Sequence, residues 1–68
     1  MKESRKRFFS GKDAAIKASN YLFDELTSIQ KKTEEEGGTV VSSDHHCAKL
    51  SNGDYEVFID VEIEDGTN

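Results

Sequence analysis

The chain has 68 residues, of which 34% are apolar and 34% are charged, so it has enough apolar surface for one helix on one small sheet and none for a second domain. Its formal net charge of −5 argues against direct binding to nucleic acid, because contacts to phosphates need a surplus of Lys and Arg. No apolar run approaches the roughly 20 residues of a membrane span, and the amino terminus lacks the apolar core of a signal peptide, so we expect a cytoplasmic protein with no membrane partner.

The cysteine content bears on how so short a chain is stabilised. Cys47 is the only cysteine, which excludes an internal disulfide and is typical of a reducing compartment. Small domains without disulfides commonly gain stability by association, so we expect a homo-oligomer, a dimer or larger. The single domain should span residues 1–68, with residues 1–4 and 66–68 frayed.

The chain begins with a basic segment that ends in two aromatic residues. Residues 5–9, Arg-Lys-Arg-Phe-Phe, are expected to form a short first strand. Residues 10–13, Ser-Gly-Lys-Asp, match a capping box, in which the side chains of the first and fourth residues bond to backbone N–H groups at the start of a helix. The helix should therefore begin near Gly11.

Apolar residues at spacings of three and four then predict an amphipathic helix. Its apolar stripe contains Ala15, Ala18, Leu22, Leu26 and Ile29, with Ile16, Tyr21 and Phe23 on the flanks. Residues 31–36 are charged except for Thr33, and their three acids crowd the negative end of the helix dipole, so the last turn is expected to fray or project. Gly37 and Gly38 predict a left-handed stop.

Residues 39–50 predict a second strand, apolar at both ends and polar in the middle. Asn52-Gly53 after it is typical of a two-residue type I′ hairpin turn. In that register Asp44 lies on the face that should be buried, where an unpaired carboxylate is costly. Either that end of the hairpin extends beyond the core, or a bulge near residues 42–44 turns Val41 inward, which is the interpretation we favour.

The third strand has the clearest pattern in the chain. Apolar and acidic residues alternate through residues 55–64, and successive side chains of a strand point to opposite faces. One face has Tyr55, Val57, Ile59, Val61 and Ile63, and the other has Glu56, Phe58, Asp60, Glu62 and Glu64. The most apolar strand belongs in the middle. The sequence therefore predicts an α+β fold in the order βαββ, with one helix on a three-stranded antiparallel sheet of strand order 1-3-2.

Two resemblances follow from these segments. The element order and the closing Tyr-x-Val-x-Ile-x-Val-x-Ile strand resemble dodecins, small flavin-binding shells with a strand-helix-strand-strand subunit. Dodecins stack flavin on a tryptophan, and this chain has none, so the resemblance implies an oligomeric shell without implying a flavin site. The stretch Phe-Ser-Gly-Lys-Asp at residues 9–13, before an amphipathic helix, resembles the small acidic sporulation proteins of bacilli.

Residues 44–47, Asp-His-His-Cys, are candidate metal ligands. On a strand, His45 and Cys47 share one face while Asp44 and His46 share the other, so each face offers two ligands, fewer than a zinc site needs. The type I′ register adds Asp60 opposite His45. We expect a solvated strand end with no metal and no cofactor, and metal binding stays an alternative.

The sequence contains no pattern of residues typical of a catalytic site. Adjacent positions in a strand point apart, so Cys47 lacks the aligned base and orienting group that a nucleophile requires, and the register places it opposite Phe58. Gly37-Gly38 follows a helix rather than opening one, so it does not aim a helix amino terminus at an anion. We expect no enzyme activity.

The acidic face of the third strand is the candidate partner-binding surface. Its carboxylates lie about 7 Å apart along the strand and suit a basic surface, including the nucleic-acid site of another protein. The members of this face are Glu56, Phe58, Asp60, Glu62 and Glu64. The alternatives are a solvated sheet face, a dodecin-like shell that stores a small ligand, and pairing of the acids with the basic residues 5–7 of the first strand.

Overall fold

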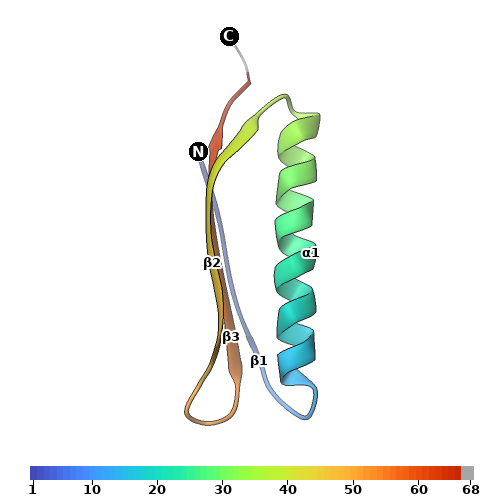
Figure 1. Cartoon of the computed structure of the whole chain (residues 1–68), viewed down its shortest axis with the longest axis vertical. Helices are drawn as coiled ribbons and strands as arrows, with labels where there is room; N and C mark the ends of the chain where they lie inside the picture. The colour runs from blue at the N-terminus through green and yellow to red at the C-terminus, as the bar shows by residue number, and fades with distance from the viewer. Residues whose placement is uncertain (67–68) are drawn as a thin grey trace.

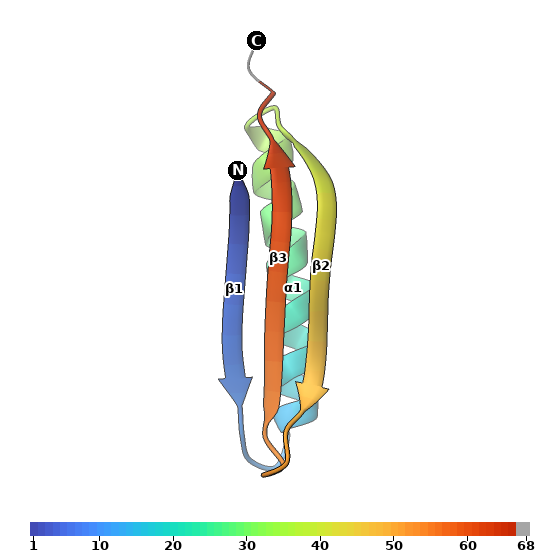
Figure 2. The same ribbon diagram turned by 90° about the vertical axis from the view of Figure 1, so that its left-hand side faces the viewer.

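The computed structural model describes residues 1–66 of the chain, which form four elements. In chain order these are β1 (Lys2–Phe9), α1 (Ala14–Glu35), β2 (Thr39–Lys49) and β3 (Tyr55–Glu64). The three strands make one antiparallel sheet in the order β1-β3-β2, with α1 along one face (Figures 1 and 2). The predicted fold class, element order and strand order are confirmed.

The chain ends differ in part from the sequence-based expectation. β1 begins at Lys2, so most of the segment expected to fray belongs to the strand. Its first pairs with β3 join Lys2 to Glu62 and Glu3 to Val61, which explains why pairing extends so far. Of the carboxyl-terminal residues expected to fray, residues 67–68 lie outside the described part of the chain.

The core is a single line of branched side chains on β3, covered by α1. Val57, Ile59 and Val61 are at most 1% exposed, and Ile63 is nearly as buried. Because β3 is the central strand, it has a neighbour on both sides as well as the helix above it. The alternation predicted for this strand is therefore confirmed, and its apolar face is the side that meets α1.

The start of α1 lies three residues later than predicted. The N-cap is Asp13, with no side-chain hydrogen bond to the cap, so the predicted capping box of residues 10–13 is wrong. Gly11 has φ of +95° and accepts a bond from the N–H of Ala14 at 3.3 Å. These residues form the turn out of β1, because the chain must reverse before the helix can lie back on the sheet.

The end of α1 is ordered through the charged segment that was expected to fray. Thr33 is only 4% exposed, so the last turn packs against the rest of the fold, and its hydroxyl donates to the carbonyl oxygen of Ile29 within the helix at 2.7 Å. Gly37 has φ of +81°, and the N–H of Gly38 donates to the Thr33 carbonyl at 2.9 Å. This is a Schellman stop, as the glycine pair predicted.

Four of the five residues of the predicted stripe lie on the buried side of α1: Ala18 and Ile29 are buried, and Leu22 and Leu26 are half-buried against the core. The buried residues of α1 are Ala14, Ala18, Ile29 and Thr33, whereas Ala15 is exposed. Two flanking residues of the predicted stripe, Ile16 and Phe23, are 63% and 70% exposed. A 22-residue helix over three strands thus leaves apolar side chains in solvent.

The hairpin between β2 and β3 has a three-residue loop rather than the predicted two. The N–H of Leu50 donates to the Asp54 carbonyl at 2.7 Å, and that of Gly53 donates to the Leu50 carbonyl at 3.0 Å. A type I′ turn requires positive φ at both Asn52 and Gly53. Gly53 has φ of +93°, but Asn52 does not have a positive φ. The arrangement is that of a tight turn followed by a glycine bulge, and the predicted turn type is wrong.

The longer loop shifts the register of β2 by one residue relative to the prediction. Lys49 pairs with Tyr55, and Asp44 pairs with Asp60 instead of lying beneath the helix. A bulge between Val40 and Ser42 then changes the phase of the strand. A bulge is present, as predicted, but it lies at Val41 and not at residues 42–44, and it leaves Val41 52% exposed, so the predicted inward position of Val41 is wrong.

Candidate functional site

The face of the sheet that α1 does not cover is open over its whole length in the described part of the chain (Figures 1 and 2). We call it the open face. Cross-strand pairing places its side chains in four rows across β1, β3 and β2. From the hairpin end these rows are Phe8, Glu56 and Ala48; Lys6, Phe58 and His46; Ser4, Asp60 and Asp44; and Lys2, Glu62 and Ser42.

The row nearest the middle carries the aromatic centre of the open face. The rings of Phe58 and His46 stack with centroids 5.2 Å apart and an angle of 19° between their planes. Lys6 is the partner of Phe58 on β1, and its ammonium lies 5.7 Å from the centroid of Phe8, in cation–π range. Phe58 is half-buried and Phe8 is 56% exposed, so this end presents aromatic surface to solvent.

Most carboxylates of the central strand on this face have a cation beside them. Glu56 lies 3.4 Å from the Lys6 ammonium and 3.7 Å from Nε2 of His46. Asp60 accepts from the Ser4 hydroxyl at 2.9 Å and lies 3.5 Å from the Lys2 ammonium. Of the basic residues 5–7, only Lys6 pairs with a carboxylate of β3, because Arg5 and Arg7 lie on the helix side, so the pairing predicted for these residues is confirmed only for Lys6.

The end of the open face away from the hairpin is more acidic. Glu62 pairs with the amino group of Met1 at 3.2 Å, while Glu64 is exposed near the end of β3. Asp44 is exposed directly opposite Asp60, and like charges at such positions repel one another. The open face thus has an aromatic half and an acidic half.

The structure places all five predicted partner-binding residues on this one face and brings them together with residues that the sequence did not assign to the binding surface. The predicted residues are Glu56, Phe58, Asp60, Glu62 and Glu64. The added residues come from the two edge strands, chiefly Phe8 and Lys6 on β1 and His46 on β2. The alternation of Lys2, Ser4, Lys6 and Phe8 was visible in the sequence, but only the register shows which acids they meet.

The candidate metal ligands of residues 44–47 remain divided between two faces. His45 and Cys47 lie on the helix side, opposite Ile59 and Val57, while Asp44 and His46 lie on the open face. The predicted pairs of His45 with Asp60 and of Cys47 with Phe58 are wrong because the register differs by one residue. Among residues 1–66, no group of three or more His, Cys, Asp or Glu side chains is placed to hold a metal ion.

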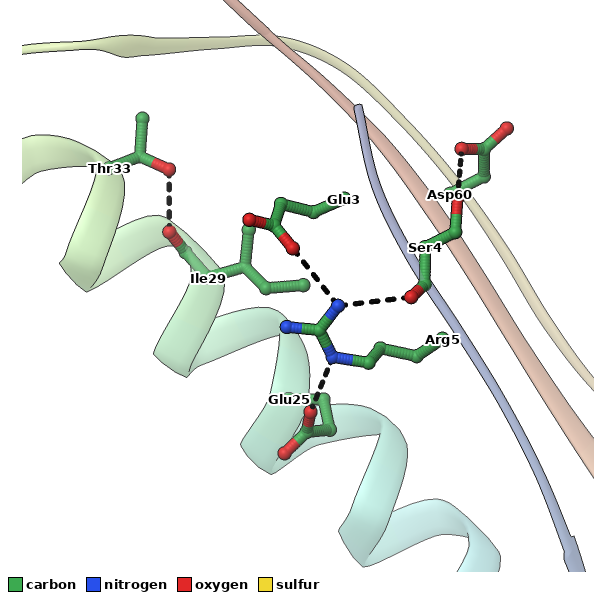
Figure 3. Close-up of polar contacts among 7 residues, drawn as sticks. All are labelled: Glu3, Ser4, Arg5, Glu25, Ile29, Thr33 and Asp60. Carbon is green, nitrogen blue, oxygen red and sulfur yellow. Dashed lines mark hydrogen bonds and ion pairs between the residues drawn. The ribbon is translucent and has the colours of Figure 1, made fainter. Parts of the chain in front are cut away.

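The helix side of β1 has a polar cluster around Arg5 (Figure 3). Its guanidinium donates to Glu3 at 3.0 Å, to the Ser4 carbonyl at 3.0 Å and to Glu25 on α1 at 3.2 Å. The hydrogen bond to Glu3, supported by its charge and by Glu25, raises the pKa of Arg5 above its usual value, so this side chain stays a cation. Arg5 ties β1 to the helix, and we assign it a structural role.

A cavity of about 260 Å³ lies above this cluster, between β1 and the end of α1. Its lining alternates in charge, with Arg5 and Lys32 beside Glu3 and Glu36. Such a lining favours neither an anion nor a cation. The cavity is therefore a weaker candidate for binding than the open face.

Comparison of this chain with protein-family models, with curated proteins and with solved structures finds no match. No helix among residues 1–66 is long and apolar enough to cross a membrane. The open face is thus assigned on geometry and chemistry alone.

Proposed function

We propose that this protein is a non-enzymatic interaction module that binds a protein partner through the open face. The observation that carries the proposal is an uncovered sheet face with Phe58 at its centre and the exposed ring of Phe8 beside it. Aromatic side chains near the middle of a surface are the residues that most often dominate binding energy in protein interfaces. An open three-stranded face also suits the broad contact of a protein partner better than it suits a small molecule, which prefers an enclosed site.

The acidic half of the face indicates the chemistry of that partner. Asp60, Glu62 and Glu64 follow one another along β3, on one side of the strand. Their cations are exposed, and exposed ion pairs contribute only about 0.2–1 kcal/mol each, so a partner's Lys or Arg can replace them at little cost. The partner we propose has a basic surface that also offers an apolar side chain to Phe58, as a nucleic-acid-handling protein can.

The test is capture of partners from the native host with three forms of the protein, followed by mass spectrometry. The variant Phe58→Ala/Glu62→Lys changes the aromatic centre and the charge of the open face. The matched control Ile16→Ala/Asp24→Lys makes the same kinds of change on exposed positions of α1. We expect the first variant to lose at least about tenfold of the captured partner and the control to retain it.

A charge-only variant, Glu62→Lys/Glu64→Lys, keeps Phe58 and so separates loss of binding from loss of folding. It should reduce capture in proportion to the positive charge of the partner, and circular dichroism should show an unchanged fold. Undiminished capture by both open-face variants would refute this assignment. Capture lost equally by the α1 control would move the binding surface to the helix.

A further inference from the structure

The two edge strands of the sheet, β1 and β2, differ in how strongly their charges oppose pairing with another strand. β1 carries Lys2, Arg5, Lys6 and Arg7, and a second β1 would bring these cations together. β2 has 11 residues, and from Ser42 to Ala48 its only formally charged side chain is Asp44. An edge strand that is long and nearly uncharged is a template for strand addition. In Figure 2 no element lies beside β2 on the side away from β3.

The backbone groups that β2 offers to a neighbour follow from the hairpin. The N–H of Leu50 bonds to Asp54 across the hairpin, and backbone groups alternate in direction along an antiparallel strand. The N–H and C=O groups of Ser43, His45 and Cys47 therefore point away from β3. The bulge at Val41 interrupts this series at the other end of the strand.

We propose that two copies of the chain associate through β2, antiparallel about a twofold axis at His45, to form one continuous six-stranded sheet. In this register His45 faces His45 of the second copy, and Ser43 faces Cys47 of the second copy. All of these residues have outward backbone groups, so each of these pairs forms ladder hydrogen bonds. The twofold axis is perpendicular to the sheet, so both helices lie on one side and both open faces on the other.

Side-chain complementarity selects this register, because a carboxylate accepts hydrogen bonds and an imidazole N–H donates them. The register places Asp44 opposite His46 of the second copy, and the symmetry repeats the contact. Both residues lie on the open face, and their position between hydrogen-bonded pairs is the one in which opposite side chains are closest. If the twofold axis lay at Asp44, this residue would face Asp44 of the second copy. If the axis lay at His46, this residue would face His46 of the second copy.

The helix side adds an apolar contribution. Leu26 lines a small cavity between α1 and β2 together with Ser43, and Phe23 lies one turn earlier on the same side of α1. Because α1 and β2 run in opposite directions (Figure 1), the turn that precedes Leu26 lies beside a part of β2 that follows Ser43. Phe23 is 70% exposed, and a second β2 extends the sheet beneath it.

Directed disulfides test the register. Ser43→Cys places a thiol opposite the native Cys47 of the second copy, where Cα atoms of a hydrogen-bonded pair are about 5.5 Å apart, within the range of a disulfide. Within one chain these positions are about 13 Å apart and do not bond. Oxidised glutathione should convert Ser43→Cys to a covalent dimer. The matched control Ser42→Cys, whose side chain lies on the other face, and the native chain should remain uncrosslinked.

Light scattering tests the association itself. The native protein should show twice the 7.6 kDa mass of the chain and dissociate on dilution. Asp44→Lys should raise the dissociation constant about tenfold, because it removes both contacts to His46, while the lysine stays compatible with Asp60 in its own chain. A monomer at all concentrations, a larger assembly, or crosslinking of the native chain through Cys47 would overturn the proposal. The results of the crosslinking and light-scattering experiments do not depend on whether the open face captures a partner.

Discussion

Replacing two neighbouring residues of β3 tests the arrangement on which the open face depends. Ile59 is fully buried beneath α1, and Phe58, the residue before it, lies half-buried on the open face. Truncation of a buried Ile to Ala costs about 2–5 kcal/mol. A chain of 68 residues has an unfolding free energy of about 3–10 kcal/mol, so Ile59→Ala should remove a large share of it.

The expected cost of Phe58→Ala is smaller although the side chain is larger. The variant loses the stacked contact with His46, which is worth about 0.5–1.5 kcal/mol, and part of its burial, while solvent already reaches the ring. With a urea slope of about 1 kcal/mol per molar, the unfolding midpoint should fall by about 3 M for Ile59→Ala and by about 1 M for Phe58→Ala.

Urea unfolding followed by the helical circular dichroism signal measures both variants. The measurements need equal protein concentrations, because association stabilises the folded state by mass action. Near-equal losses for the two variants, or a larger loss for Phe58→Ala, would contradict the assignment of the two faces of β3. In that case the aromatic centre proposed for binding would be part of the core.

Two further substitutions and one deletion test other parts of the structure. Gly37→Ala should lower the unfolding free energy by about 1–2 kcal/mol, measured by urea unfolding, because an L-residue is strained at φ of +81°; no loss would mean that the helix stop relaxes. Arg5→Gln should cost about 1 kcal/mol in thermal unfolding by leaving two carboxylates without their shared cation, and more than Lys2→Gln, which removes one exposed pair. Deletion of Ser51 leaves a two-residue Asn-Gly loop and should retain the native ladder, visible as unchanged amide exchange in β2 and β3; loss of that protection would show that the three-residue loop determines pairing.

The sequence predicted the fold because one strand has an unambiguous period. Each of Val57, Ile59 and Val61 lies where alternation places it, and a single apolar face on one strand requires a helix above it. The helix was found for the same reason, although its buried face extends at both ends beyond the predicted stripe. Ala14 and Thr33 belong to that face, and a small or polar residue gives little signal in a hydrophobic pattern.

The candidate site was predicted only in part because it depends on register. The acidic side of β3 and the place of Phe58 follow from period 2 alone. Which residues of β1 and β2 join this face depends on the residues of β3 that they pair with. In the hairpin of β2 and β3, the length of the loop sets this register. Asn52-Gly53 is the usual signal for a two-residue turn, yet Gly53 occupies the left-handed position of a longer loop here. One extra loop residue moved the side chains of residues 42–49 to the other face.

The loop and the bulge act together, and both proposals depend on that combination. A two-residue loop with no other change would bury the carboxylate of Asp44 beneath the helix, which is costly without a partner. The longer loop turns Asp44 and His46 to the open face, and the bulge then restores the phase so that Val40 pairs with Ile63 on the helix side. The two irregularities therefore keep the core apolar at one end of β2 while presenting a donor and an acceptor on its free edge. That spacing of two residues is what makes the edge complementary to a second copy of itself.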